Sequence, residues 1–151
     1  MGGRGARFDL ETSKRNGTIE KVAYGTTYKS LAQDGIIKII QGVKGSNNYN
    51  KSPLESKTPN RIYGYVNTKG KLDSIVFMNK KGKKYKEIDW GHKHNGSYLH
   101  VHIGVEHKRN LTRNKLSKAE KRIYNQVMSL AKSNGIEIWK KWQKMIMSMS
   151  I

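Results

Sequence analysis

The sequence predicts an α+β fold, in which a small antiparallel β-sheet of about four or five strands packs against a few helices and the C-terminus is helical. Residues 61–106 contain four short segments of strand character, joined by brief turns rich in Gly and Lys. Residues 117–146 then change to the helical spacing of apolar side chains. With 151 residues and 35% hydrophobic content, the chain is long enough for one modest core.

The elements follow from local patterns. Residues 24–33 carry a threonine cap and end at Asp34-Gly35, which predicts a short helix. The β-branched run at residues 36–40 predicts a buried strand, whereas residues 42–59 are rich in Gly, Ser, Asn and Pro and predict a loop. Four further strands are expected at residues 61–67, 72–79, 84–90 and 99–106.

The C-terminal region begins with a capping box, in which Ser117 can cap a helix while Glu120 reaches back to the backbone. Asn134-Gly135 is a typical helix end, so we expect a helix between these signals. A second helix is predicted over residues 138–146, where Trp, Met and Ile lie opposite Lys. The expected core consists of Ile37, Ile39, Ile62, Val66, Ile75, Phe77, Ile88, Val101, Ile123, Val127 and Leu130.

Charge is the most unusual bulk property of the chain. The formal net charge is +19 and the isoelectric point is near 10.1. Such a charge opposes the compact state and indicates a polyanionic partner, with nucleic acid as the first candidate and an acidic membrane as the second. Residues 1–22 are expected to form a basic, flexible arm, and residues 23–151 a single domain.

The absence of certain sequence features argues against a membrane-spanning or secreted protein. We find no apolar stretch long enough to span a bilayer and no signal peptide. There is no cysteine, which fits an intracellular protein and leaves His, Asp and Glu as the available metal ligands.

Four of the five histidines form two His-x-His pairs within residues 92–102, after a run of lysines. Side chains two residues apart on a strand point to the same face, so His100 and His102 are expected to project together. Asn95-Gly96 is a strong turn signal that could fold His92 and His94 back towards them. The segment would then gather imidazole groups beside a surface that attracts phosphate.

One interpretation of this cluster is a nuclease that needs no metal. Cleaving RNA at its 2′-hydroxyl requires a general base, a general acid and cations that stabilise the charge on phosphorus. The candidate catalytic residues are His92, His94, His100 and His102, with Asp89 to orient an imidazole. The candidate nucleic-acid-binding residues are Arg61, Lys80, Lys81, Lys83, Lys84, Lys86 and Lys93.

Two alternatives stand beside this interpretation. The same four histidines, with Glu87 and Asp89, offer enough ligands for a divalent ion such as zinc, manganese or nickel, which would activate water and steady the phosphate. The histidines and lysines could also be ordinary solvated side chains of an edge strand and a hairpin. Only the metal-dependent interpretation requires a cofactor.

The sequence resembles small proteins encoded in the head-gene regions of phages and prophages, which also occur as C-terminal extensions of Mu F-like head-morphogenesis proteins. The resemblance rests on residues 1–6, residues 53–63, and residues 83–89 with the two histidine pairs that follow, and it covers roughly residues 24–131. Several such extensions are similar to polymorphic toxin domains. This similarity implies a toxin-like nuclease, and the chemistry of the histidine segment makes RNA a more expected substrate than DNA.

The resemblance also implies a setting and partners. The setting would be the cytoplasm of a bacterial host, the phage virion, or both. The partners would be nucleic acid together with phage head or portal proteins, or an acidic immunity protein. A non-enzymatic, DNA-associated minor head protein is the alternative function, because it needs the basic surface but not the histidines.

Overall fold

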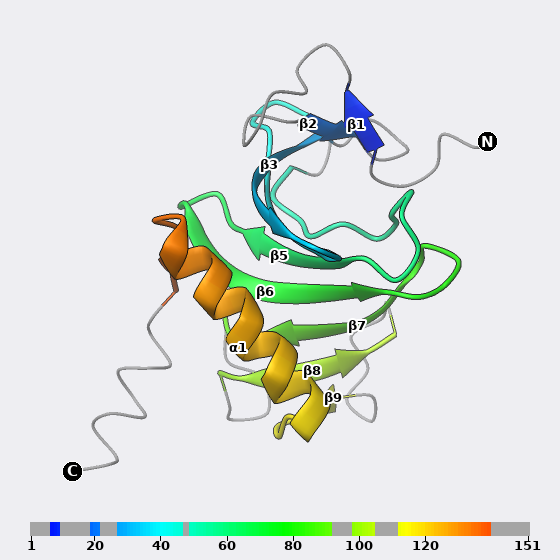
Figure 1. Ribbon diagram of the computed structural model, residues 1–151, viewed down its shortest axis with the longest axis vertical. Coiled ribbons are helices and arrows are strands. Elements are labelled where there is room, and N and C mark those ends of the chain that lie inside the picture. Colours follow the sequence, from blue (N-terminus) through cyan, green and yellow to red (C-terminus); the bar gives the residue numbers. More distant parts are fainter. Residues whose placement is uncertain are drawn as a thin grey trace.

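The computed structural model describes residues 7–9, 19–21, 27–46, 49–91, 98–104 and 112–139. Within these ranges, one helix lies across one face of a mixed sheet (Figure 1). The strands are β1 Arg7–Asp9, β2 Ile19–Lys21, β3 Thr27–Asp34, β4 Ile37–Gly42, β5 Ile62–Val66, β6 Lys71–Met78, β7 Lys84–Asp89, β8 His100–Ile103, β9 Thr112–Arg113 and β10 Glu137–Ile138, and the helix is α1 Lys118–Ser133.

Strands β1 to β9 lie side by side in chain order. Every neighbouring pair is antiparallel except β4 and β5, which are parallel. A parallel pair needs a crossover, and residues 43–61 make it. The short strand β10 runs parallel to the start of β6. The antiparallel meander from β5 to β8 confirms the predicted centre of the sheet.

The α+β class is therefore confirmed, but with more strands and fewer helices than predicted. The predicted helix at residues 24–33 is wrong, because residues 27–34 form β3. Buried Tyr28, Ser30 and Ala32 alternate with more exposed neighbours, which is the period of a strand. The supposed helix end at Asp34-Gly35 is instead the turn of the β3–β4 hairpin, in which Gly35 adopts a φ of 61°.

The prediction of a second helix over residues 138–146 is wrong at its first residue, Ile138. Ile138 is buried in β10, opposite Leu72 of β6, and residues 140–146 of that predicted helix lie outside the described ranges. At the other end of the chain, β1 and β2 fall within residues 1–22. Most of that stretch is also outside the described ranges, so the flexible arm stays a prediction.

Helix α1 begins and ends where the sequence predicts. The Ser117 hydroxyl accepts a hydrogen bond from the Glu120 backbone N–H at 3.2 Å, and the Glu120 carboxylate accepts one from the Ser117 N–H at 2.8 Å. Asn134 caps the C-terminal end, and Gly135 follows it with a φ of 68°. None of the helical structure in the described ranges combines the length and apolar character needed to cross a bilayer.

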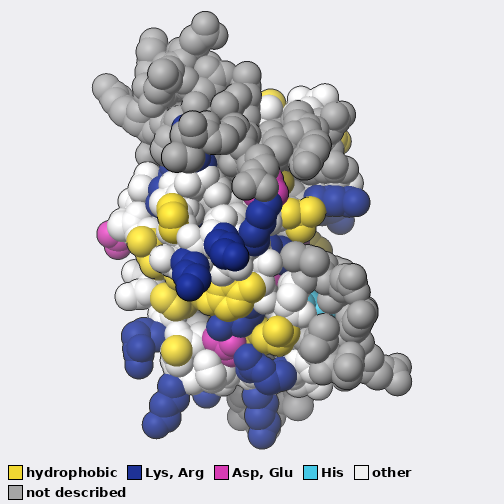
Figure 2. All heavy atoms as spheres, turned by 90° about the vertical axis from the view of Figure 1, so that its right-hand side faces the viewer, with side chains coloured by type: hydrophobic (Ala, Val, Ile, Leu, Met, Phe, Trp, Pro, Cys, Tyr) yellow, Lys and Arg dark blue, Asp and Glu magenta, His cyan; other side chains and the backbone are white. Residues whose placement is uncertain are grey.

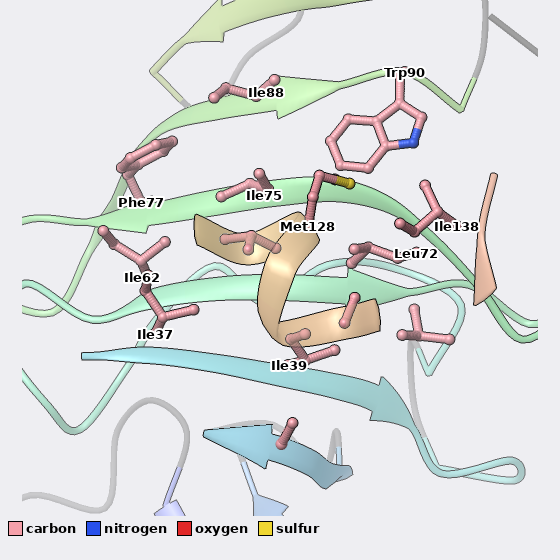
Figure 3. Packing of buried hydrophobic residues seen from close by; sticks show 14 of the residues in the cluster. Ile37, Ile39, Ile62, Leu72, Ile75, Phe77, Ile88, Trp90, Met128 and Ile138 are labelled. Carbon is pink, nitrogen blue, oxygen red and sulfur yellow. The ribbon is translucent and has the colours of Figure 1, made fainter. Parts of the chain in front are cut away.

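The main core lies between the sheet and α1 (Figure 3). Strand residues such as Ile39, Ile75 and Ile88 project towards the side of the sheet on which Met128 of α1 packs. Nine of the eleven predicted core residues are buried, and the other two, Ile123 and Leu130, are partly buried against the same cluster. The apolar pattern of the sequence therefore identified this core correctly.

The opposite face of the sheet carries a second, more aromatic cluster, which consists of Tyr28, Ile40, Tyr63, Tyr65, Val76 and Met78. Residues 49–58 of the crossover, which we call the covering segment, are bonded to this face. The hydroxyl of Tyr28 donates to the carbonyl of Lys51 at 2.8 Å, and that of Tyr65 donates to the carbonyl of Tyr49 at 3.0 Å. The covering segment thus shields a face that no described helix covers.

Candidate metal centre

Strands β7 and β8 place a carboxylate opposite an imidazole twice. Their antiparallel register pairs Asp89 with His100 and Glu87 with His102. The residues between them, including Ile88, are fully buried in the core beneath α1. Because successive strand residues point to opposite faces, all four polar side chains point to the face with the aromatic cluster.

Three of these side chains converge on one point. One potential ligand atom from each of Asp89, His100 and His102 lies within 4.8 Å of the other two. The Nε2 atoms of the two imidazoles are 2.9 Å apart, and the rings are nearly perpendicular, at 87°. The exposed fractions are 8% for Asp89, 0% for His100 and 3% for His102. The result is a small, buried cluster of two imidazoles and one carboxyl group.

Hydrogen bonds from outside the cluster orient the two rings. His100 Nδ1 lies 2.8 Å from the carbonyl oxygen of Tyr98, which can only accept, so this nitrogen carries the proton and donates. The Nε2 of neutral His100 therefore directs a lone pair into the cluster. His102 Nδ1 lies 3.5 Å from the hydroxyl of Thr112, which can donate or accept. His102 can consequently adopt the tautomer that donates to His100, or the one that offers a second lone pair.

The carboxyl group of the cluster is also unusual. Burial, and then the nearby Glu87 carboxylate, raise the pKa of Asp89 to about 8, although a hydrogen bond from the Gly91 N–H at 2.8 Å opposes the rise. Without a cation in the cluster, Asp89 therefore holds a proton at neutral pH. A divalent ion would favour the ionised form, so metal binding here exchanges a proton for the ion.

This donor set fits a divalent transition-metal ion. Two imidazole nitrogens and a carboxylate oxygen are ligands that zinc, manganese and nickel accept, and three protein ligands leave further coordination positions for water or substrate. With metal–nitrogen bonds of about 2.0–2.1 Å, two adjacent nitrogens lie ~2.8–3.0 Å apart at a ligand angle of about 90° and ~3.3–3.4 Å apart at the tetrahedral angle. The observed 2.9 Å between the His100 and His102 Nε2 atoms corresponds to the arrangement at about 90°.

Beside the cluster lies a buried ion pair between Glu87 and Lys84, whose side chains are 8% and 6% exposed. Glu87 also accepts a long hydrogen bond, at 3.5 Å, from the hydroxyl of Ser52 in the covering segment. Glu87 is paired with Lys84 and is not among the three converging ligands, although the sequence made it a metal-ligand candidate. Its contacts instead join the covering segment to the strand that carries Asp89.

The structure brings together three of the five residues predicted as catalytic, namely Asp89, His100 and His102. The joint projection of His100 and His102, predicted from the strand period, is confirmed. His92 and His94 lie outside the described residues, so the predicted folding of their turn towards the cluster stays a prediction.

Sequence reasoning missed Thr112. It reaches the cluster because β9 pairs with β8 in the register that sets Thr112 opposite His102. No local motif in the sequence marks this residue, since its role depends on pairing between segments ten residues apart.

The predicted nucleic-acid-binding residues occupy different surroundings. Lys80 and Lys81 are exposed on the turn between β6 and β7. Arg61 is buried, and its guanidinium donates to the carbonyl of Gly35 and the hydroxyl of Thr58, so it is engaged within the fold. Lys93 lies outside the described residues. The three remaining lysines, Lys83, Lys84 and Lys86, each form an ion pair with a glutamate.

Comparison of the chain with protein-family models, characterised proteins and solved structures found no match. The class of this protein is therefore described from its own fold and site. It is an α+β protein with a buried cluster of two histidines and one aspartate, on the sheet face opposite its helix.

Proposed function

We propose that the protein is a metal-dependent nuclease that holds a divalent transition-metal ion through Asp89, His100 and His102. The observation that carries this proposal is the convergence of these three ligands at a buried point. The net charge of +19 supports a polyanionic substrate. A metal ion at this point would lower the pKa of a bound water and neutralise charge on a phosphodiester, the two effects that its hydrolysis needs.

The direct contact between the imidazoles favours a metal over the metal-free interpretation. In acid–base cleavage of RNA, one group takes the proton of the 2′-hydroxyl while another protonates the leaving oxygen, so the two act at different atoms of the substrate. His100 and His102 instead direct their Nε2 atoms at each other, and His100 Nδ1 is occupied by the Tyr98 carbonyl. Such a pair is better arranged to share an ion than to flank a phosphate.

We further propose the biological setting from the resemblance to phage head-region proteins and toxin domains. In that setting the substrate is RNA in preference to DNA, and the protein acts in the bacterial host or is carried in the virion.

A second candidate is a non-enzymatic, DNA-associated head protein in which the ion only fastens β7 to β8. The observation that favours it is the burial of all three ligands, which is typical of structural metal sites.

Metal binding and cleavage, measured on the same preparations, test these candidates. Chelator-treated protein is titrated with Zn²⁺, Mn²⁺ and Ni²⁺ by calorimetry and then incubated with labelled RNA and DNA. We expect one bound ion per chain and cleavage that depends on it. His102→Ala and Asp89→Asn should lose the ion and at least about 100-fold in cleavage rate, whereas Asp34→Asn, at the exposed end of β3, should behave like the wild type.

The outcomes separate the candidates. An ion bound by the wild type and lost in both variants, without cleavage of either nucleic acid, supports the structural candidate. Cleavage that persists in chelator would restore the metal-free interpretation. If the wild type binds none of the three ions, the metal centre is wrong.

A further inference from the structure

Tyr85 is an exposed aromatic residue on the strand that carries Asp89. It is 42% exposed. Among the residues that the structure describes, the exposed large hydrophobic ones are Ile36, Leu54 and Tyr85. A bulge sets its position, because Lys86 pairs with Phe77 and Lys84 with Met78, which leaves Tyr85 between two successive pairs. Bulges of this kind re-aim a side chain and are common beside active sites.

Packing holds the Tyr85 ring in place despite its exposure. The ring meets Phe77 edge to face, with 6.4 Å between centroids. Lys86 Nζ lies 5.7 Å from the centroid of Tyr85 and 4.6 Å from that of Phe77. Lys86 is itself anchored by Glu120 at 3.0 Å. A ring held in this way loses little conformational freedom when a planar group stacks on it.

The neighbourhood of Tyr85 is positively charged. Lys80 and Lys81 are exposed on the preceding turn and have no acidic partner in the part of the chain that the structure describes. Glu120 is shared by Lys86 and Arg113, so one negative charge offsets only one of two positive charges there. On the side of the molecule where β6 ends and β7 begins, hydrophobic side chains lie between groups of Lys and Arg (Figure 2).

The Tyr85 ring and the cluster of Asp89, His100 and His102 lie on different sides of the sheet. The Tyr85 ring contacts Phe77 of the core beneath α1 and lies near Lys86, which pairs with Glu120 of α1. The three ligands of the cluster point to the opposite face. The surface around Tyr85 is therefore separate from the candidate metal centre.

We infer that Tyr85 and the lysines around it form a stacking platform for an unpaired base, which is a binding site for single-stranded nucleic acid separate from the metal centre. In a duplex each base is stacked between its neighbours and presents only its edge in a groove. In a single strand a base can lie on an exposed aromatic ring while the phosphates contact lysines. This inference goes beyond the proposed function, because it assigns a second site that does not depend on the metal centre.

The test measures binding in chelator, so that cleavage does not interfere. Fluorescence anisotropy of the whole protein is followed with a short single-stranded RNA, the same sequence as DNA, and the blunt duplex of that DNA. Tyr85→Ala should weaken single-strand binding by about 5- to 100-fold and leave duplex binding unchanged. Tyr85→Phe keeps the ring and should bind like the wild type. Leu54→Ala, which removes a 58% exposed apolar side chain without a flat ring, should do the same.

Each outcome bears on one claim. If Tyr85→Ala binds every oligonucleotide like the wild type, or weakens single strands and duplex equally, the platform is wrong while metal-dependent cleavage by the wild type still supports the nuclease. If the wild type binds none of the three oligonucleotides, the platform is also wrong, and a protein partner is left as the occupant of this surface. A selective loss for single strands without cleavage under any metal supports the platform and sinks the nuclease. Comparison of the RNA and DNA arms identifies the preferred sugar.

Discussion

Replacement of Glu120 by glutamine tests how firmly the helix is joined to the strand that carries the site. The Glu120 carboxylate accepts hydrogen bonds from the Arg113 guanidinium at 3.0 and 2.7 Å and from the Ser117 N–H at 2.8 Å. It also pairs with Lys86 of β7 at 3.0 Å. The Glu120 side chain is only 2% exposed, so its carboxylate is shielded from water where it joins α1 to β7.

The expected loss of stability in Glu120→Gln follows from the pKa of the Glu120 carboxyl group. Burial by itself would raise the pKa of Glu120, but hydrogen bonds from Arg113, Ser117 and Lys86 outweigh it and lower the pKa from 4.5 to about 2. At about 1.4 kcal/mol per pKa unit, this shift corresponds to ~3 kcal/mol of stability at neutral pH. The Arg113 side chain is 45% exposed and its charge is screened by water, so we expect Glu120→Gln to lower the free energy of unfolding by about 2 kcal/mol.

The pH dependence has a definite sign. Because the folded-state pKa of Glu120 lies below the unfolded-state value, its stabilisation is complete above pH 4.5 and is lost as the pH falls towards 2. Urea unfolding, followed by circular dichroism at pH 7, 4 and 3, should show a difference between wild type and Glu120→Gln that shrinks with acidity. Glu137→Gln is the matched control, since its carboxylate pairs with Lys71 at the surface with 70% exposure and should contribute less than about 1 kcal/mol. Equal effects of the two variants, or a difference that does not change with pH, would refute the reasoning.

Three further substitutions test the packing around the site. Gly82→Ala should cost at least about 2 kcal/mol and speed limited proteolysis of residues 49–58, because Gly82 has a φ of 76° and a Cβ would lie 2.1 Å from the Ser56 carbonyl oxygen; unchanged proteolysis would contradict it. Gly64→Ala should lower the free energy of unfolding by about 1–3 kcal/mol in thermal melts, since its Cβ would lie 3.1 Å from three core side chains. Ser117→Ala removes the helix cap and should cost about 1 kcal/mol in urea unfolding, and a neutral effect would mean that water replaces the cap.

Much of the fold could be predicted because its signals are local. The capping box of Ser117 and Glu120 involves residues three apart, so the start of α1 is readable without knowledge of the rest of the chain. The same holds for the strands from β5 to β8, whose apolar residues alternate between short turns. The joint projection of His100 and His102 also follows from the strand period alone.

Pairing between distant segments decided the rest. Residues 27–34 have a pattern that a helix could also use, but their hydrogen bonds to β4 and their alternating burial make them a strand. Ile138 likewise joins β6 instead of starting a helix. Local propensity differs between helix and strand by only about 1 kcal/mol or less per residue. Burial and hydrogen bonding against a neighbouring strand can exceed that difference.

The sequence by itself determined which residue types could form a centre and that two histidines would share a face. Only the tertiary structure decided that Asp89 lies opposite His100, that Thr112 reaches His102, and that Arg61 is held within the fold. The reason is register. A shift of one residue between β7 and β8 would send every side chain of one strand to the other face. The register is specified by burial of Ile88 and Val101 in the core beneath α1, a constraint supplied by the whole sheet and not by the histidine segment.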